Sequence, residues 1–310
     1  MSLFDAYVFV DWSSRNAPGP PHPAPDSVWV AEMCPPNEVK ASYHRTRSDV
    51  YAHLLEVLSS YVRAKLRVLV GFDFPYGYPA GFCQCLSADS LQQPWRRTWE
   101  HLSNMVEDDD SNNSNRFEIA SRVNREVGGN RGGPFWNCPT NQASKWLRSH
   151  APTFPFITLT GRKLERLRVT EMRIHGVQEV WKLYGPGSVG SQALVGIPRV
   201  KSLRTALPLV EHSRVWPFET GFSPRPSLPV GPFILHAEMW PGIVNQDVTT
   251  VMMAQPNLVR DQAQVRCMCN WAASLDRQDA LGESFDTPHN LTDLELQRCI
   301  EEEGWILGCC

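Results

Sequence analysis

A short apolar run that closes on an acid constrains the fold of this chain more than any other feature. Residues 68–72 read VLVGF, a continuous run without polar alternation, which is typical of a strand buried on both faces of a sheet. Asp73 follows, and the next residues, FPYGYP, contain prolines and a glycine that prevent a regular strand or helix from continuing. We therefore expect the chain to turn here and to leave Asp73 at the rim of the sheet, where open α/β sheets bind ligands.

Acids occupy comparable places in three further segments. Residues 7–11 (YVFVD) predict a strand that ends on Asp11, and residues 233–240 (FILHAEMW) predict one with Glu238 near its end. Residues 258–275 carry an apolar stripe at helical spacing behind a possible cap at position 257, and Asp261 lies in the first turn of this expected helix.

Such a set of carboxylates is suited to hard divalent cations, which prefer oxygen ligands. Two such ions about 4 Å apart can clamp the attacking and leaving oxygens of a phosphodiester. We expect Asp11, Asp73 and Asp261 to hold Mg²⁺ or Mn²⁺ and Glu238 to assist or to position water. The alternative for each acid taken alone is an ordinary solvated position in a loop.

The order of the expected elements indicates a mixed α/β protein. Strands at 7–11, 27–32 and about 40–46 follow one another closely and predict an antiparallel meander, after which a helix over 48–65 leads to the strand at 68–72. A single domain over 1–310 is expected, with 81–155 as a largely helical insertion or cap and 276–310 as a C-terminal extension. Further expected elements are helices over 94–105, 116–126, 203–211 and 292–303, and a strand, or the end of one, over 215–219.

Composition excludes several classes of protein. The 310 residues are 42% hydrophobic and 20% charged, which is the balance of a globular chain with a substantial core. The net charge of −3 gives no global basic field, so any nucleic-acid role must use a local patch or metal ions. The N-terminus lacks the basic and apolar regions of a signal peptide, and we expect a cytoplasmic protein without a membrane partner. The cysteine pairs lack the spacing of zinc sites, which favours reduced, buried thiols.

Two central segments could bind an anion. Residues 161–173 (GRKLERLRVTEMR) form a locally basic stretch in which Arg168 and Glu171 could read a small anionic ligand, with Lys182 and Ser188 nearby; a solvated helix face is the alternative. Residues 185–190 match G-x-G-x-x-G, the pattern of a dinucleotide site, but the context favours a glycine-rich turn into a helix that begins near residue 191. The acidic and polar run at 107–115 is expected to be a solvated loop.

At these residues the chain resembles the family described as domain of unknown function 429. The resemblance lies in VFVDWSS (8–14), VGFDFPYGYP (70–79), RVTE (168–171), WKLYGPGSVGSQALVGIPR (181–199), VWPFETG (215–221), AEMWP (237–241) and RDQAQV (260–265). It implies a ribonuclease H-like fold, with three antiparallel strands first and helices on both sides of the sheet. It also implies that Asp11, Asp73 and Asp261 converge as in nucleases of that fold, although Gln264 stands where an acid is frequent in the family.

Two functions follow from these observations. The first is a metal-dependent phosphodiester hydrolase that acts on a short or structured nucleic acid or on a phosphorylated small molecule, with Arg168 steadying a phosphate. The low charge argues against long duplex substrates, which need many phosphate contacts. The second is a non-catalytic protein of the same fold that binds a nucleotide or another small anion through Arg168, Glu171 and the 185–190 loop.

Overall fold

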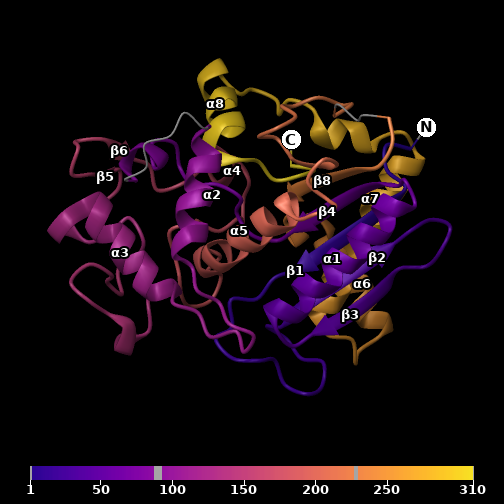
Figure 1. The fold of residues 1–310 in the computed structure, drawn as a ribbon, viewed down its shortest axis with the longest axis horizontal. Helices are drawn as coiled ribbons and strands as arrows, with labels where there is room; N and C mark the ends of the chain where they lie inside the picture. The colour runs from indigo at the N-terminus through magenta and orange to yellow at the C-terminus, as the bar shows by residue number, and fades with distance from the viewer. Residues whose placement is uncertain (1, 87–92, 227–229, 310) are drawn as a thin grey trace.

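The computed structural model describes residues 2–86, 93–226 and 230–309 and folds them around a six-stranded sheet (Figure 1). The strands in these ranges are β1 (Ala6–Asp11), β2 (Val28–Met33), β3 (Lys40–His44), β4 (Arg67–Phe72), β5 (Phe156–Ile157), β6 (Lys163–Leu164), β7 (Ser213–Val215) and β8 (Phe233–Glu238). The α-helices are α1 (Arg47–Arg63), α2 (Pro94–Met105), α3 (Arg116–Gly128), α4 (Val169–Arg173), α5 (Gly190–Thr205), α6 (Asn245–Ala254), α7 (Arg260–Arg277) and α8 (Asp293–Arg298).

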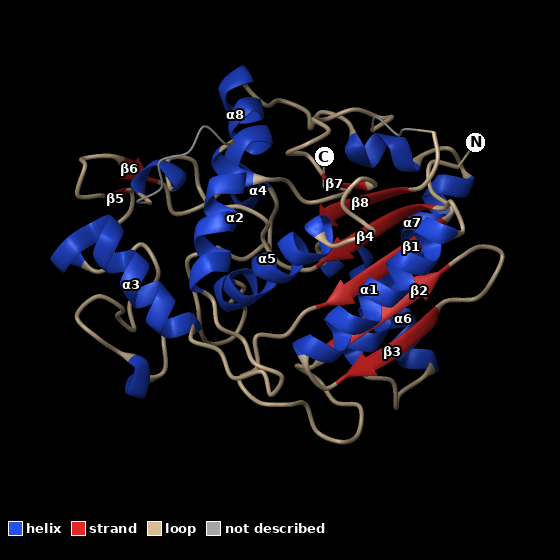
Figure 2. Ribbon diagram, viewed as in Figure 1, coloured by secondary structure: helices blue, strands red, loops and turns tan. Residues whose placement is uncertain are grey.

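The sheet combines an antiparallel part and a parallel part. Its strand order is β3-β2-β1-β4-β8-β7, in which β1 pairs antiparallel with β2, and β2 with β3. The pairs β1 with β4, β4 with β8 and β7 with β8 are parallel. In Figure 2 the arrows of β1, β4 and β8 point the same way, toward the part of the molecule that contains α2 and α5. The predicted mixed sheet, a meander followed by parallel strands, is confirmed.

Helices cover both faces of the sheet. Because side chains alternate along a strand, Val8, Val10 and Val70 pack on one face with residues of α1 and α5, which we call the α1 face. Tyr7, Phe9 and Leu69 pack on the other with residues of α7, which we call the α7 face. Each face buries its own apolar cluster, which explains why the central strands read as unbroken apolar runs.

The expected insertion and extension share these clusters. The helix α2 has the predicted bounds, and its residues Trp95, Trp99 and Leu102 join the cluster of the α1 face, as do residues of α3. At the other end of the chain, Thr292 and Glu295 form the predicted capping box of α8. Trp305 and other residues that follow α8 pack into the cluster of the α7 face.

Some element boundaries differ from the expectations. Thr46 caps α1, accepting a hydrogen bond from the Asp49 N–H (3.1 Å), so the helix begins earlier than position 48. The helix α7 begins at Arg260 with Val259 as its N-cap, because residues 256–258 form a turn instead of a cap at 257. The helix expected over 203–211 is wrong: residues 203–205 are the end of α5, and the chain then turns. Of the two alternatives for residues 215–219, the end of a strand is the one observed, because β7 covers Ser213–Val215 and pairs with β8.

No helix in the described part of the chain is long and apolar enough to cross a membrane.

Candidate functional site

Asp11 and Asp73 lie side by side at the carboxyl ends of two neighbouring parallel strands. Val10 of β1 is paired with Phe72 of β4, so the residue that follows each of them stands at the same level of the sheet edge. Alternation along the strands places Asp11 on the α7 face, where Phe9 packs, and Asp73 on the same face. The N–H of Trp12 donates a hydrogen bond to Oδ1 of Asp73 (2.7 Å) and ties the two strand ends together.

Asp261 approaches this pair from the helix that covers the α7 face. It lies in the first turn of α7, which packs against β1 and β2. Its Oδ2 accepts a hydrogen bond from the N–H of Asp26 (2.8 Å), a residue of the loop that leads into β2. Because β2 is paired with β1 up to Asp11, this bond holds the start of α7 at the level of the sheet edge. We refer to Asp11, Asp73 and Asp261 as the aspartate centre.

The electrostatics of the aspartate centre indicate that its carboxylates are near enough to influence one another. Burial and the nearby charges of Asp73, Asp261 and Asp26 raise the pKa of Asp11 well above its ordinary value. Burial, despite the hydrogen bond from Trp12, raises the pKa of Asp73 to about 7, and the charge of Asp261 contributes. Burial also raises the pKa of Asp261. In the described ranges no lysine or arginine forms an ion pair with any of the three. The charge of Arg260 and backbone N–H groups favour the ionised form of Asp261, but burial outweighs them.

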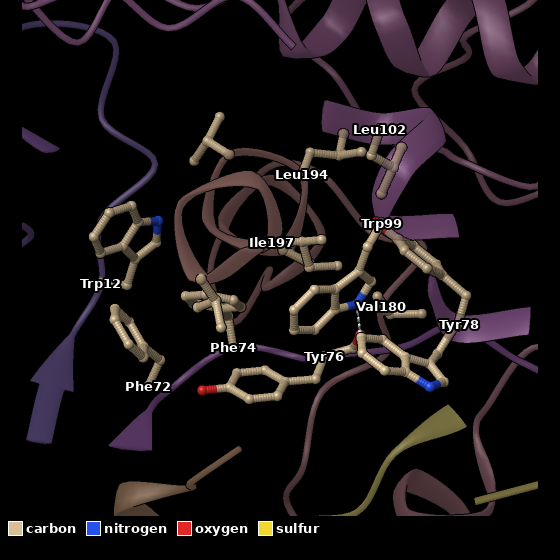
Figure 3. Close-up of a cluster of buried hydrophobic side chains, with 14 of the residues drawn as sticks. Trp12, Phe72, Phe74, Tyr76, Tyr78, Trp99, Leu102, Val180, Leu194 and Ile197 are labelled. Carbon is tan, nitrogen blue, oxygen red and sulfur yellow. Dashed lines mark hydrogen bonds between the residues drawn. The ribbon is translucent and has the colours of Figure 1, made fainter. Parts of the chain in front are cut away.

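Aromatic packing fixes the backbone beside the aspartate centre. The indole of Trp12 is 1% exposed and packs against Phe72 and Phe74, with ring centroids 5.7 and 6.0 Å away (Figure 3). The carbonyl oxygen of Trp12 accepts a hydrogen bond from Gln192 of α5. Both backbone polar groups of Trp12 are therefore held, the N–H by Asp73 and the carbonyl by α5.

Carboxylates of the C-terminal extension hold the turn that follows Asp73. Glu302 accepts hydrogen bonds from the N–H groups of Gly81 (2.9 Å) and Cys83 (2.7 Å), and Glu303 accepts one from Ala80 (2.9 Å). Burial, despite these bonds, raises the pKa of Glu302 to about 7. Gly77 is required by close approach, because a Cβ there would lie 2.2 Å from the carbonyl oxygen of Glu302. The predicted turn is thus a rigid structure.

Glu238 and Arg168 form a buried ion-pair network on the other face of the sheet. Glu238 is level with Phe72, whose side chain lies on the α1 face, so alternation turns Glu238 away from the aspartate centre. Its carboxylate accepts hydrogen bonds from Nη1 (2.8 Å) and Nη2 (2.6 Å) of Arg168 and from the Tyr76 N–H (2.9 Å). Glu171 binds Nε of the same guanidinium at 2.7 Å.

The contacts of this network do not match the expected roles of its members in binding an anion or positioning water. The Arg168 side chain is fully buried, and its donors are taken by Glu171, Glu238 and the Glu303 carbonyl. A phosphate could reach it only by displacing a buried carboxylate, and Glu238 has no free oxygen with which to position water. Burial raises the pKa of Glu171 to about 7 against the attraction of Arg168. We therefore read Arg168, Glu171 and Glu238 as structural.

Lys182 and Ser188 belong to the turn that leads into α5. Nζ of Lys182 donates to the Pro186 carbonyl (2.8 Å), and the N–H of Ser188 donates to the Gly185 carbonyl (3.1 Å). Gly190 opens the helix, and a Cβ there would lie 2.3 Å from the Val180 carbonyl oxygen. The glycines thus serve close backbone packing, in agreement with the interpretation of this segment as a turn into a helix.

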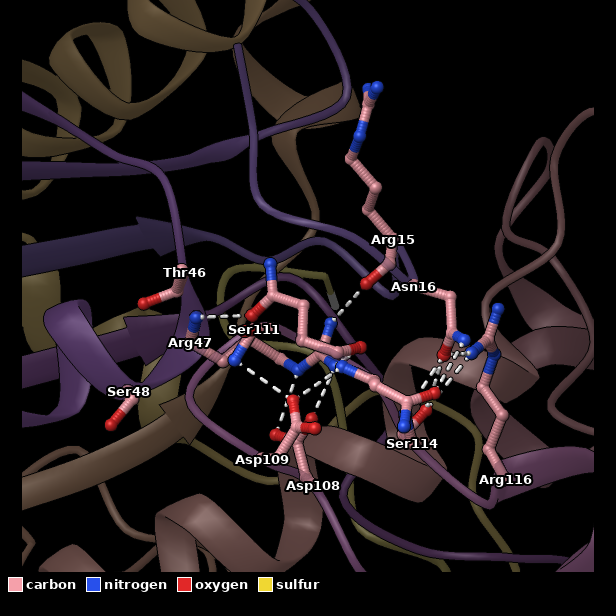
Figure 4. Close-up of polar contacts among 12 residues, drawn as sticks. Arg15, Asn16, Thr46, Arg47, Ser48, Asp108, Asp109, Ser111, Ser114 and Arg116 are labelled. Atoms are coloured by element: carbon pink, nitrogen blue, oxygen red, sulfur yellow. Dashed lines mark hydrogen bonds and ion pairs between the residues drawn. The ribbon is translucent and has the colours of Figure 1, made fainter. Parts of the chain in front are cut away.

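A second buried network, missed in the sequence, anchors the chain that follows Asp11. The guanidinium of Arg47 is buried, pairs with Asp108 and donates to the carbonyls of Ser13 (3.1 Å) and Arg15 (2.8 Å). Asp108 is also bound by Arg199 at 3.0 Å (Figure 4 draws the surrounding contacts). The expectation that run 107–115 is wholly solvated is therefore wrong, because Asp108 compensates two arginines. Sequence patterns gave no signal for this pairing, which joins positions far apart in the chain.

The described residues contain no group of three or more His, Cys, Asp or Glu side chains arranged to hold a metal ion. The donor chemistry of the aspartate centre nevertheless suits a hard cation, because it offers carboxylate oxygens without an ion-pair partner. Mg²⁺ is usually held by one or two carboxylates, and water and substrate phosphates complete its coordination. Metal binding by Asp11, Asp73 and Asp261 stays a prediction.

Comparisons of the chain with protein-family models, with curated proteins and with solved structures find no match. The resemblance to the domain of unknown function 429 likewise stays a prediction.

Proposed function

We propose that this protein is a metal-dependent phosphodiester hydrolase whose reaction centre is formed by Asp11, Asp73 and Asp261. The observation that carries the proposal is the placement of these three acids on one face of the sheet, at the carboxyl ends of β1 and β4 and at the start of α7. Buried carboxylates that lie near one another without an ion-pair partner are costly for stability, and groups with strongly shifted pKa values are concentrated at functional sites.

The arrangement of elements supports the ribonuclease H-like fold as part of this proposal. A meander of three antiparallel strands is followed by parallel strands, and the acids stand on the first strand, on its parallel neighbour and on a late helix. These are the places that the family resemblance implies. Fold alone does not determine function, so the chemistry of the site carries the conclusion.

Each part of the centre has a role in the proposed reaction. Asp11 and Asp73 are the residues that would hold a divalent cation, and Asp261 would hold a second cation or orient water. A divalent cation bound there would supply Lewis-acid stabilisation of the attacking and leaving oxygens of the phosphodiester. The Trp12 N–H orients the Asp73 carboxylate, and the Asp26 N–H orients that of Asp261, so the oxygens are fixed before substrate arrives.

Hydrolysis of bis(p-nitrophenyl) phosphate and of a short single-stranded oligonucleotide, with Mn²⁺ or Mg²⁺, tests the proposal. We expect Asp11→Asn and Asp73→Asn to lower the rate by more than the roughly 10- to 100-fold that loss of an outer-sphere partner of a metal costs. A change at an exposed aspartate elsewhere, Asp247→Asn in α6, should leave the metal dependence intact. Equal metal-dependent rates for the wild type and Asp11→Asn would overturn the proposal.

The same measurements address the non-catalytic alternative, in which the fold binds a nucleotide or another small anion. If Mn²⁺ binds but neither substrate is cleaved, the aspartate centre serves binding and not hydrolysis. Because Arg168 is engaged in the core, such a ligand would have to use other cations of the surface.

A further inference from the structure

A basic and aromatic groove lies on the face of α3, outside the aspartate centre. Two hollows of about 500 and 370 Å³ adjoin one another, since Phe117, Glu118 and Gln142 line both, and together we call them the α3 groove. The first hollow is also lined by Arg122, Arg125 and Trp146, and the second by Asn16 and Arg116.

The charge of the α3 groove contrasts with that of the whole chain. Of the described residues that line the two hollows, Arg116, Arg122 and Arg125 are basic and Glu118 is the only acid. The chain as a whole carries −3. Arg122 and Arg125 lie three apart on α3, hence on one side of the helix, and both are exposed. These arginines form a local basic patch, which a chain of negative net charge needs in order to bind a polyanion.

Trp146 adds a stacking platform to this patch. Its ring is half-buried and is contacted by the Arg125 guanidinium, 5.3 Å from the centroid, and by Nζ of Lys145, 4.4 Å away. Both cations are exposed and can move to a phosphate while a base takes their place on the ring. Stacking of a base on an aromatic ring stabilises more than an exposed cation–π contact, so the exchange is favourable.

One end of the α3 groove is connected to the aspartate centre by a short stretch of chain. Arg116 donates from Nη1 to Oδ1 of Asn16 (2.5 Å) and to Oγ of Ser114 (2.9 Å). Asn16 is five residues after Asp11, and five extended residues span at most about 17 Å. The buried pair of Arg47 with Asp108 fixes this connection through the carbonyls of Ser13 and Arg15.

We propose that the α3 groove binds single-stranded nucleic acid, with Arg122, Arg125 and Lys145 on phosphates and Trp146 stacked on a base. This inference deepens the proposed function, because it names the polymer that would cross the aspartate centre. A duplex fits less well, since its bases are not free to stack on a side chain.

Fluorescence anisotropy in EDTA with labelled oligothymidylate of about 16 nucleotides tests this binding apart from catalysis. We expect Trp146→Ala to weaken binding by about fivefold or more. The double variant Arg122→Ala/Arg125→Ala should weaken it as well and lower the magnitude of the salt slope, log Kd against log salt, by about 1.4. Its matched control is Arg63→Ala/Arg277→Ala, which removes exposed arginines at the ends of α1 and α7 and should change neither quantity.

Three results would overturn the inference: unchanged binding in Arg122→Ala/Arg125→Ala, equal affinity for the duplex of the same length, or equally strong competition by polyglutamate. The last of these would indicate an acidic protein partner. The double variant alters only exposed side chains, so the test does not depend on whether Trp146→Ala folds. Asp11→Asn should bind the oligonucleotide as the wild type does while losing hydrolysis, which separates failure of the groove from failure of the aspartate centre.

Discussion

Replacing Asp73 by asparagine tests the aspartate centre most directly, because it removes one charge and keeps the shape. The amide oxygen of asparagine can still accept the hydrogen bond that Asp73 Oδ1 receives from the Trp12 N–H (2.7 Å). The change therefore isolates the repulsion among Asp73, Asp11 and Asp261 from the packing of the strand ends. We expect the metal-free Asp73→Asn variant to be more stable than the wild type at alkaline pH and similar to it in mild acid.

The sign and size of the effect follow from the pKa of Asp73, which is raised to about 7. Between the ordinary pKa of aspartate and this value, the folded state holds a proton that the unfolded state has released, so stability falls as pH rises through this interval. At about 1.4 kcal/mol per pH unit the full loss is roughly 4 kcal/mol. Because Asp73 is partly exposed, solvent screens the repulsion, and we expect about 1 to 3 kcal/mol.

Urea unfolding of both proteins in EDTA, from about pH 5 to pH 8, measures this difference. Glu219→Gln is a control in which stability should change with pH in the opposite direction. Burial opposes the ionisation of Glu219, but its hydrogen bonds to Arg204 outweigh burial and lower its pKa. Glu219 thus contributes stability that is present above its unfolded pKa and is lost as pH falls through its folded pKa. Equal destabilisation of Asp73→Asn at both ends of the pH range would show that its carboxylate is not repelled by its neighbours in the folded protein.

Three further outcomes follow from the same contacts. Mn²⁺ titrated into the wild type near pH 6 should displace protons from the aspartate centre, so the calorimetric heat should depend on the ionisation enthalpy of the buffer, and Asp11→Asn should lose this dependence. Arg168→Met should lower the free energy of unfolding by about 3 to 5 kcal/mol, because it leaves Glu171 and Glu238 buried without their partner; urea unfolding checks this. Gly77→Ala should cost about 2 kcal/mol or more in the same assay, since its Cβ would meet the Glu302 carbonyl at 2.2 Å, whereas Gly161→Ala, with no atom within 4 Å of its Cβ, should cost only backbone strain.

The sequence predicts the parts of this protein that depend on local pattern. The runs that became β1, β4 and β8 are apolar, short and closed by acids or turn residues, and α2 and the capping box of α8 follow from helical spacing and cap chemistry. Asp11 and Asp73 could be paired before the structure because each follows a buried strand, and the carboxyl ends of parallel neighbours meet at one sheet edge.

The role of Glu238 could not be predicted in the same way. Its strand is apolar on both faces, so the sequence shows no alternation from which to decide the face of a given residue. Pairing with β4 decides it: Glu238 is level with Phe72, and Met239 follows on the level of Asp73. An acid one position later in the strand would have faced the aspartate centre.

The ion-pair partners of the buried arginines could not be predicted from the sequence for a related reason. Charge patterns along the chain describe exposed surfaces well, but Arg47 and Arg168 bind carboxylates 61 and 70 positions away, and the folded topology alone creates these pairs. The contact between Glu171 and Arg168 is the local part of this network. An acid three residues after a helix N-cap commonly accepts a hydrogen bond from the backbone N–H of the N-cap residue.

The contrast between the two sets of buried acids is the strongest physical support for a functional centre. On the α1 face this protein neutralises Glu171 and Glu238 with the fully buried Arg168, and beside α1 it neutralises Asp108 with Arg47. The same chain leaves its three aspartates at the sheet edge without an ion pair in the described residues, although each has a raised pKa. If only stability mattered, an arginine beside these aspartates or an amide in place of one of them would be favoured. A positively charged ligand is the simplest way to compensate the repulsion among the three carboxylates, and protons replace that ligand as the pH falls.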